Sequence, residues 1–144
     1  MSSMENLETS KNTFSLESIL EEMKKRNRDC GAIGIFVGFV KGFNRGKKVL
    51  RLEYEKFDEL FNLKIKEIEN KIREHPGVSD VFIFHKSGTL KPGEDIMYVI
   101  VVGKSRNDVW KPLKECVELI KKELPIWKKE IYDNGAVWVH DVEK

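Results

Sequence analysis

Apolar residues recur along the chain with two different periods, and these periods predict helices alternating with pairs of strands. Stripes with spacing i, i+3, i+4 and i+7 predict three helices, over residues 15–26, 57–72 and 109–124. Ser15 has the character of an N-cap for the first helix. Asn107 or Asp108 is expected to cap the third.

Six segments between these helices have strand character. Residues 32–40 are apolar almost throughout, which predicts a strand buried on both faces. Residues 49–55 alternate, with Leu50, Leu52 and Tyr54 on one face. We expect these two strands to form a hairpin around a basic loop. The other predicted strands are 78–85, 96–102, 126–132 and 136–139.

The order α-ββ-α-ββ-α-ββ predicts an α+β fold of alternating helices and antiparallel hairpins. A strong turn signal, Asp133-Asn134-Gly135, joins the last two strands. Residues 1–12 are polar and aperiodic, and are predicted to form a flexible N-terminal arm. Residues 13–144 are then expected to form a single domain.

Composition narrows the class of protein. With 40% hydrophobic and 35% charged residues, the 144-residue chain is typical of a soluble globular protein. Its net charge of +2 is too small to indicate nucleic-acid binding by the whole surface. A membrane span and a signal region are not evident, which predicts a cytoplasmic protein. Two cysteines without a CxxC pair and three scattered histidines indicate neither a metal site nor a catalytic triad, and such histidines are usually structural.

The candidate chemistry is cationic. Residues 41–51 contain five cations and no acid, Lys104 and Arg106 follow a predicted strand, and Lys121 and Lys128 flank Pro125. These groups could converge on one anionic ligand. They could equally be separate solvated patches, because lysine is favourable near a helix C-terminus and protects the edges of sheets. Spacing alone leaves both interpretations open.

Several motifs, in the same order along the chain, resemble those of the large, catalytic subunit of molybdopterin synthase. The most specific is the segment Leu124-Pro125-Ile126-Trp127-Lys128-Lys129-Glu130, preceded by Lys121 four residues before the proline. The other matching segments are Gly31-Ala32, Phe36-Val37-Gly38, Leu52-Glu53-Tyr54-Glu55, His85-Lys86-Ser87-Gly88, Pro92-Gly93-Glu94, Arg106 with Trp110, and Trp138-Val139.

The resemblance implies the α/β-hammerhead fold and an enzyme that inserts two sulfurs into cyclic pyranopterin monophosphate, forming the molybdopterin dithiolene. Sulfur would come from the thiocarboxylated C-terminal Gly-Gly tail of a small ubiquitin-like sulfur-carrier subunit. Two large subunits would form a homodimer at the centre of a heterotetramer. The resemblance implies no metal or cofactor for the chain itself, and no nucleic-acid or membrane partner.

The resemblance also implies roles for particular residues. Lys121 and Lys128 match the two active-site lysines, and Lys121 is expected to have the direct chemical role. Substrate would be bound by Lys41, Arg45, Ser105 and Arg106, and the tail of the small subunit by Phe36, Gly38, Pro125 and Trp127.

One departure keeps other functions open. The family commonly has His-Arg where this chain has Ser105-Arg106, which weakens any mechanism that moves a proton through that histidine. The alternatives are an anion- or RNA-binding module, in which the 41–51 loop follows a phosphate backbone, and an inactive interaction protein that keeps the fold.

Overall fold

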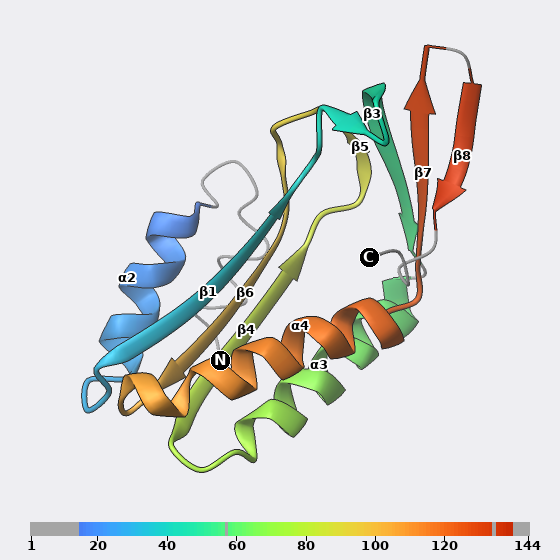
Figure 1. Ribbon diagram of the computed structural model, residues 1–144. Helices are drawn as coiled ribbons and strands as arrows, with labels where there is room; N and C mark the ends of the chain where they lie inside the picture. Colours follow the sequence, from blue (N-terminus) through green and yellow to red (C-terminus); the bar gives the residue numbers. More distant parts are fainter. Residues whose placement is uncertain (1–14, 57, 134, 140–144) are drawn as a thin grey trace.

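The computed structural model describes residues 15–56, 58–133 and 135–139, and its helices and strands confirm the α+β class (Figure 1). The predicted arm over residues 1–12 lies outside the described residues, as do Phe57 and Asn134. In chain order the elements are α2 (Leu16–Arg26), β1 (Ala32–Phe39), β2 (Phe43–Asn44), β3 (Lys47–Lys56), α3 (Asp58–Arg73), β4 (Val78–His85), β5 (Gly88–Leu90), β6 (Asp95–Gly103), the 3-10 turn η1 (Arg106–Asp108), α4 (Trp110–Glu123), β7 (Ile126–Tyr132) and β8 (Gly135–Val139).

The strands form two antiparallel sheets. In the first sheet the order is β1-β6-β4, and in the second it is β2-β3-β7-β8, with β5 paired to β3. The predicted hairpin between residues 32–40 and 49–55 is therefore wrong, because β1 pairs with β6 and β3 pairs with β7. The local hairpin is the short β2–β3 pair, which turns through Arg45 and Gly46 with φ values of 52° and 79°. Two successive positive φ values are those of a type I′ turn.

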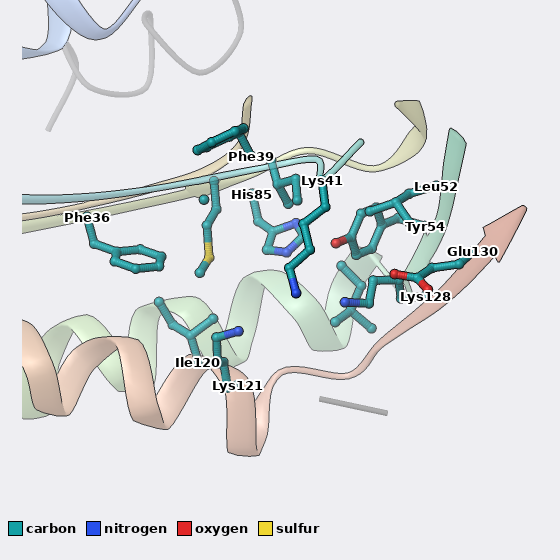
Figure 2. A pocket seen from close by; sticks show the side chains of 14 residues that line it. Phe36, Phe39, Lys41, Leu52, Tyr54, His85, Ile120, Lys121, Lys128 and Glu130 are labelled. Carbon is teal, nitrogen blue, oxygen red and sulfur yellow. The ribbon is translucent and has the colours of Figure 1, made fainter. Parts of the chain in front are cut away.

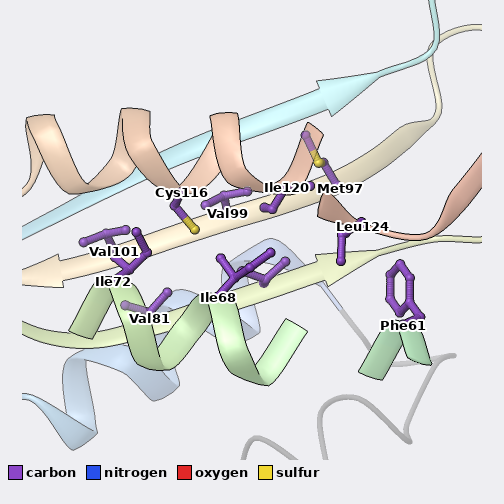
Figure 3. Close-up of a cluster of buried hydrophobic side chains, with 11 residues drawn as sticks. Phe61, Ile68, Ile72, Val81, Met97, Val99, Val101, Cys116, Ile120 and Leu124 are labelled. Carbon is purple, nitrogen blue, oxygen red and sulfur yellow. The ribbon is translucent and has the colours of Figure 1, made fainter. Parts of the chain in front are cut away.

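Helices cover both faces of the first sheet. Helix α2 packs on one face, and α3 and α4 pack side by side on the other (Figures 1 and 3). Strand β6 lies in the middle of this sheet, and its residues Val99, Ile100 and Val101 are 0% exposed. Burial between two layers of helices therefore explains why β6 is apolar at almost every position after Asp95.

Strand β1 was expected to be buried on both faces, and this is wrong. It lies at the edge of the first sheet, and Phe39 at its end is 61% exposed. Along β3 the predicted alternation is also interrupted: Val49 is buried and Leu50 is exposed. The pairing with β7 shifts between Val49 and Arg51, which leaves Leu50 as the extra residue of a β-bulge.

Helix α4 begins later than its apolar stripe predicts. Ser105 precedes the 3-10 turn, and its backbone N–H and hydroxyl both donate to the Asp108 carboxylate at 3.1 Å. The α-helix proper follows from Trp110. The expected cap at Asn107 or Asp108 is therefore wrong. This end of α4 lies far from the pocket described next.

Candidate active site

A pocket lies where the C-terminal end of α4 meets the second sheet (Figure 2). Its volume is about 270 Å³. It is lined by Phe36, Gly38, Phe39, Lys41, Leu52, Tyr54, His85, Ile96, Met97, Ile120, Lys121, Ile126, Lys128 and Glu130. Both sheets and α4 therefore contribute to one cavity.

A bend in the backbone brings the two predicted lysines together. Lys121 lies in the last turn of α4, and the Leu124 N–H closes that turn by donating to the Ile120 carbonyl. Leu124 then has an extended conformation, as expected before proline, which cannot continue the helix. The chain leaves as β7, on which Lys128 faces the same pocket as Lys121.

Lys41 completes a group of three lysines. It follows the end of β1, and Figure 2 shows its side chain reaching down between Lys121 and Lys128. Of the two interpretations left open by spacing, convergence is confirmed for these three residues. Three ammonium groups around one small cavity favour an anionic ligand.

A buried carboxylate, which sequence reasoning missed, balances part of this charge. Glu130 is 5% exposed and accepts a hydrogen bond from Asn44 Nδ2 at 2.9 Å and another from the Tyr132 hydroxyl. The sequence could have predicted that Glu130 lies in the pocket, because alternation along β7 places Ile126, Lys128 and Glu130 on one face.

His85 was also missed, having been treated as one of three scattered histidines. It ends β4, is 9% exposed and lines the pocket. Its Nδ1 lies 2.7 Å from the Lys86 carbonyl oxygen. Burial lowers the pKa of His85 to about 4; the hydrogen bond to Lys86 opposes this shift, and the charges of Lys56, Lys128 and Lys121 add to it. The ring is therefore neutral at pH 7.

Five of the predicted site residues line this pocket, namely Lys41, Lys121, Lys128, Phe36 and Gly38. Trp127, on the other side of β7, is half exposed and lines a neighbouring depression with Tyr54 and Lys56. Pro125 forms the bend itself.

The remaining predicted residues, although described by the structure, are not among those that line the pocket. Arg45 lies at the tip of the β2–β3 hairpin. Ser105 and Arg106 lie at the opposite end of α4 from Lys121, about four helical turns or roughly 20 Å away along the axis. Within one chain, the two ends of α4 cannot act on the same small ligand.

Neither a metal centre nor a membrane helix occurs among residues 15–56, 58–133 and 135–139. No group of three or more His, Cys, Asp and Glu side chains in these ranges could hold a metal ion. No helix in them has both the length and the apolar character needed to cross a membrane.

Fold and pocket together define an α+β protein with a cationic cavity suited to a small anion. The family model described as MoaE protein matches residues 9–123. The molybdopterin synthase catalytic subunit of Bacillus subtilis is 33% identical over 138 residues, covering 96% of this chain and 87% of that protein. The corresponding subunit of Pyrococcus abyssi is 35% identical over 109 residues, covering 76% and 74%.

A solved structure agrees with these relatives. The crystal structure of molybdopterin synthase from Staphylococcus aureus matches with a TM-score of 0.76 and 31% identity, covering 83% of this chain and 88% of that one. The chain belongs to the MoaE family and is a catalytic subunit of molybdopterin synthase, an enzyme of molybdenum cofactor biosynthesis. The resemblance in its sequence motifs is thereby confirmed.

Proposed function

We propose that the pocket around Lys41, Lys121 and Lys128 binds cyclic pyranopterin monophosphate and receives sulfur there from the thiocarboxylated Gly-Gly tail of a small subunit. The observation that carries this proposal is the convergence of three lysines from three separate segments on one cavity. A phosphate and a thiocarboxylate approaching together bring at least two negative charges. The three ammonium groups offset that charge, while Glu130 limits their mutual repulsion.

Lys121 and Lys128 are the proposed catalytic pair. Lys121 takes the direct chemical role, because it lies at the end of a well-packed helix beside the buried residue Ile120. Lys128 holds the substrate or transfers a proton during sulfur addition and loss of water. Lys41 binds the phosphate as a point charge, without the paired donors of an arginine.

The tail of the small subunit is proposed to enter beside Phe36 and Gly38 on β1. Both residues line the pocket, and because Gly38 has no side chain, it leaves space there for the tail. Trp127 and Pro125 would guide the tail from the neighbouring depression. A solved complex of subunits 1 and 2 of the molybdopterin-converting factor from Helicobacter pylori, of the same fold at 20% identity, supports a partner of this kind.

We further propose a homodimer at the centre of a heterotetramer. If Ser105 and Arg106 bind substrate, they must do so in the pocket of a second copy, because α4 separates them from Lys121 of their own chain. Arg45, at a hairpin tip, is suited to the same role across an interface. We place the enzyme in the cytoplasm, since the free thiols of Cys30 and Cys116 suit a reducing compartment.

The test is reconstitution with the thiocarboxylated small subunit and cyclic pyranopterin monophosphate, followed by an assay for molybdopterin. Lys121→Ala should lower the rate by roughly 100-fold or more, as for loss of a charge-stabilising or proton-transferring group. The neighbouring Lys122→Ala is the matched control and should keep the wild-type rate, because Lys122 is exposed and does not line the pocket. Normal turnover by Lys121→Ala would overturn its assigned role. A wild-type chain that makes no product, yet binds single-stranded RNA with strong salt dependence, would favour the alternative binding module.

A further inference from the structure

The hydrogen bond of His85 determines which of its ring nitrogens carries the proton. A carbonyl oxygen only accepts hydrogen bonds, so the 2.7 Å contact between Nδ1 and the Lys86 carbonyl requires the proton on Nδ1. In a neutral imidazole the other nitrogen, Nε2, is then an unprotonated acceptor. Among the hydrogen bonds of the described residues, that of His85 uses Nδ1 alone. Nε2 of His85 is therefore a hydrogen-bond acceptor in a pocket lined by lysines.

The ring cannot easily turn away from the pocket. It makes edge contacts with Tyr54, at 5.2 Å between ring centroids, and with Phe61, at 6.0 Å. Across the first sheet its backbone is in register with Met97 of β6, the buried central strand. These contacts hold the imidazole in place before any ligand arrives, which is the condition for selective recognition.

The surrounding charges keep Nε2 from taking a proton. Positive charges face the ring from β3, α4 and β7, and an exposed lysine follows β1, so an imidazolium here would be both buried and repelled. The only carboxylate lining the pocket belongs to β7 and is held by two donors of its own. The lysines are Lys56 on β3, Lys121 on α4, Lys128 on β7 and Lys41 after β1, and the carboxylate is that of Glu130 on β7.

We propose that His85 is a specificity-determining residue whose Nε2 accepts a hydrogen bond from an N–H or O–H group of the bound pterin. The pocket would then recognise two features at once: an anion, held by the lysines, and a hydrogen-bond donor a short distance from it, held by His85. This inference rests on the proposed function, because the pterin supplies both features. A sulfate ion at pH 7 supplies only the first feature, because it is an anion without an N–H or O–H group.

Two substitutions separate this role from a structural one. His85→Asn can keep a donor where Nδ1 is and so retain the bond to the Lys86 carbonyl, but it has no atom at the position of Nε2. His85→Gln loses the bond to the Lys86 carbonyl, but it can place an amide oxygen near the position of Nε2. His75→Asn is the control, because His75 forms a partly buried pair with Glu115 and does not line the pocket.

In the reconstituted enzyme, His85→Asn should raise KM about tenfold or more with little change in kcat, the pattern for lost ground-state binding. His85→Gln should lower KM again relative to His85→Asn, and His75→Asn should leave both constants unchanged. The opposite ranking, with His85→Gln worse than His85→Asn, would mean that the histidine serves only to hold Lys86, and would overturn the proposal.

A spectroscopic arm does not depend on turnover. Two-bond ¹H–¹⁵N correlations of the histidine rings at pH 7 should show His85 protonated at Nδ1 and bare at Nε2 in the free chain. Adding cyclic pyranopterin monophosphate should shift Nε2 towards a hydrogen-bonded value and leave Nδ1 protonated, whereas sulfate, which has no N–H or O–H group at pH 7, should leave Nε2 unchanged. An unchanged Nε2, or a doubly protonated ring, would refute the inference even if the wild-type enzyme is active. An inactive wild-type chain whose Nε2 still responds to the pterin would instead count against the proposed function.

Discussion

Mild acid should destabilise this protein through His85. The pKa of His85 is about 4 in the folded chain, below the ordinary value of 6.5. Between these two pH values the unfolded chain therefore binds a proton at His85 that the folded chain does not bind. The resulting stability is fully present above pH 6.5 and is lost as the pH falls towards 4. The shift corresponds to about 3 kcal/mol in total, of which about 2 kcal/mol is lost at pH 5. That is a large share of the 5–15 kcal/mol typical of a domain.

The assay is urea unfolding of the wild type and of His85→Asn at pH 8, 7, 6 and 5. At this lower limit most ordinary carboxyl groups are still ionised, since their pKa values are about 3.9 for Asp and 4.3 for Glu. The variant lacks the titrating ring, so the difference between the two free energies of unfolding should shrink by about 2 kcal/mol from pH 8 to pH 5. Parallel curves for the two proteins would refute the reasoning, because His85 would then take up its proton as readily in the folded state as in the unfolded one.

Two further predictions concern packing and thiol reactivity. A Cβ on Gly34 would lie 2.2 Å from Cγ1 of Val109, so Gly34→Ala should cost about 1–3 kcal/mol in urea unfolding. Gly38→Ala, on the same strand, would meet only ordinary contacts at 3.5 Å and should unfold like the wild type; a larger loss for Gly38 would contradict the packing. Burial raises the pKa of Cys116 to about 12, so native protein at pH 8 should take up one equivalent of iodoacetamide, at the partly exposed Cys30, and a second only in urea. Rapid native labelling of Cys116, detected by peptide mass spectrometry, would contradict its burial.

The helices and the bend in the backbone follow from local chemistry that is readable in the sequence. Ser15 caps α2 as its spacing predicts, its hydroxyl accepting from the Ser18 N–H at 3.1 Å. Pro125 ends α4 because it lacks the N–H that a helix needs. The end of the helix at Pro125 sets the direction of the short segment between Lys121 and Lys128. The convergence of these two lysines could therefore be predicted from local sequence. Each of these features depends on neighbours within a turn or two.

Strand pairing and the composition of the pocket depend on distant residues. Strand β1 does not pair with the next strands in the sequence, β2 and β3, but with the distant β6. Helices bury the apolar faces of β6 on both sides. Lys41 follows β1 and lines the same pocket as residues of β3, α4 and β7, whereas Arg106 is excluded from it because α4 separates Arg106 from Lys121.

The sequence by itself determined the alternation of elements and the family, and it predicted the two lysines that are proposed as catalytic, because periodicity, capping and short motifs act over short distances. Tertiary structure alone decided which strands pair, which cations share a cavity, and that His85 is neutral. The protonation of a histidine depends on how much water and charge surround it, and those surroundings are assembled from β3, α4 and β7 only when the chain has folded.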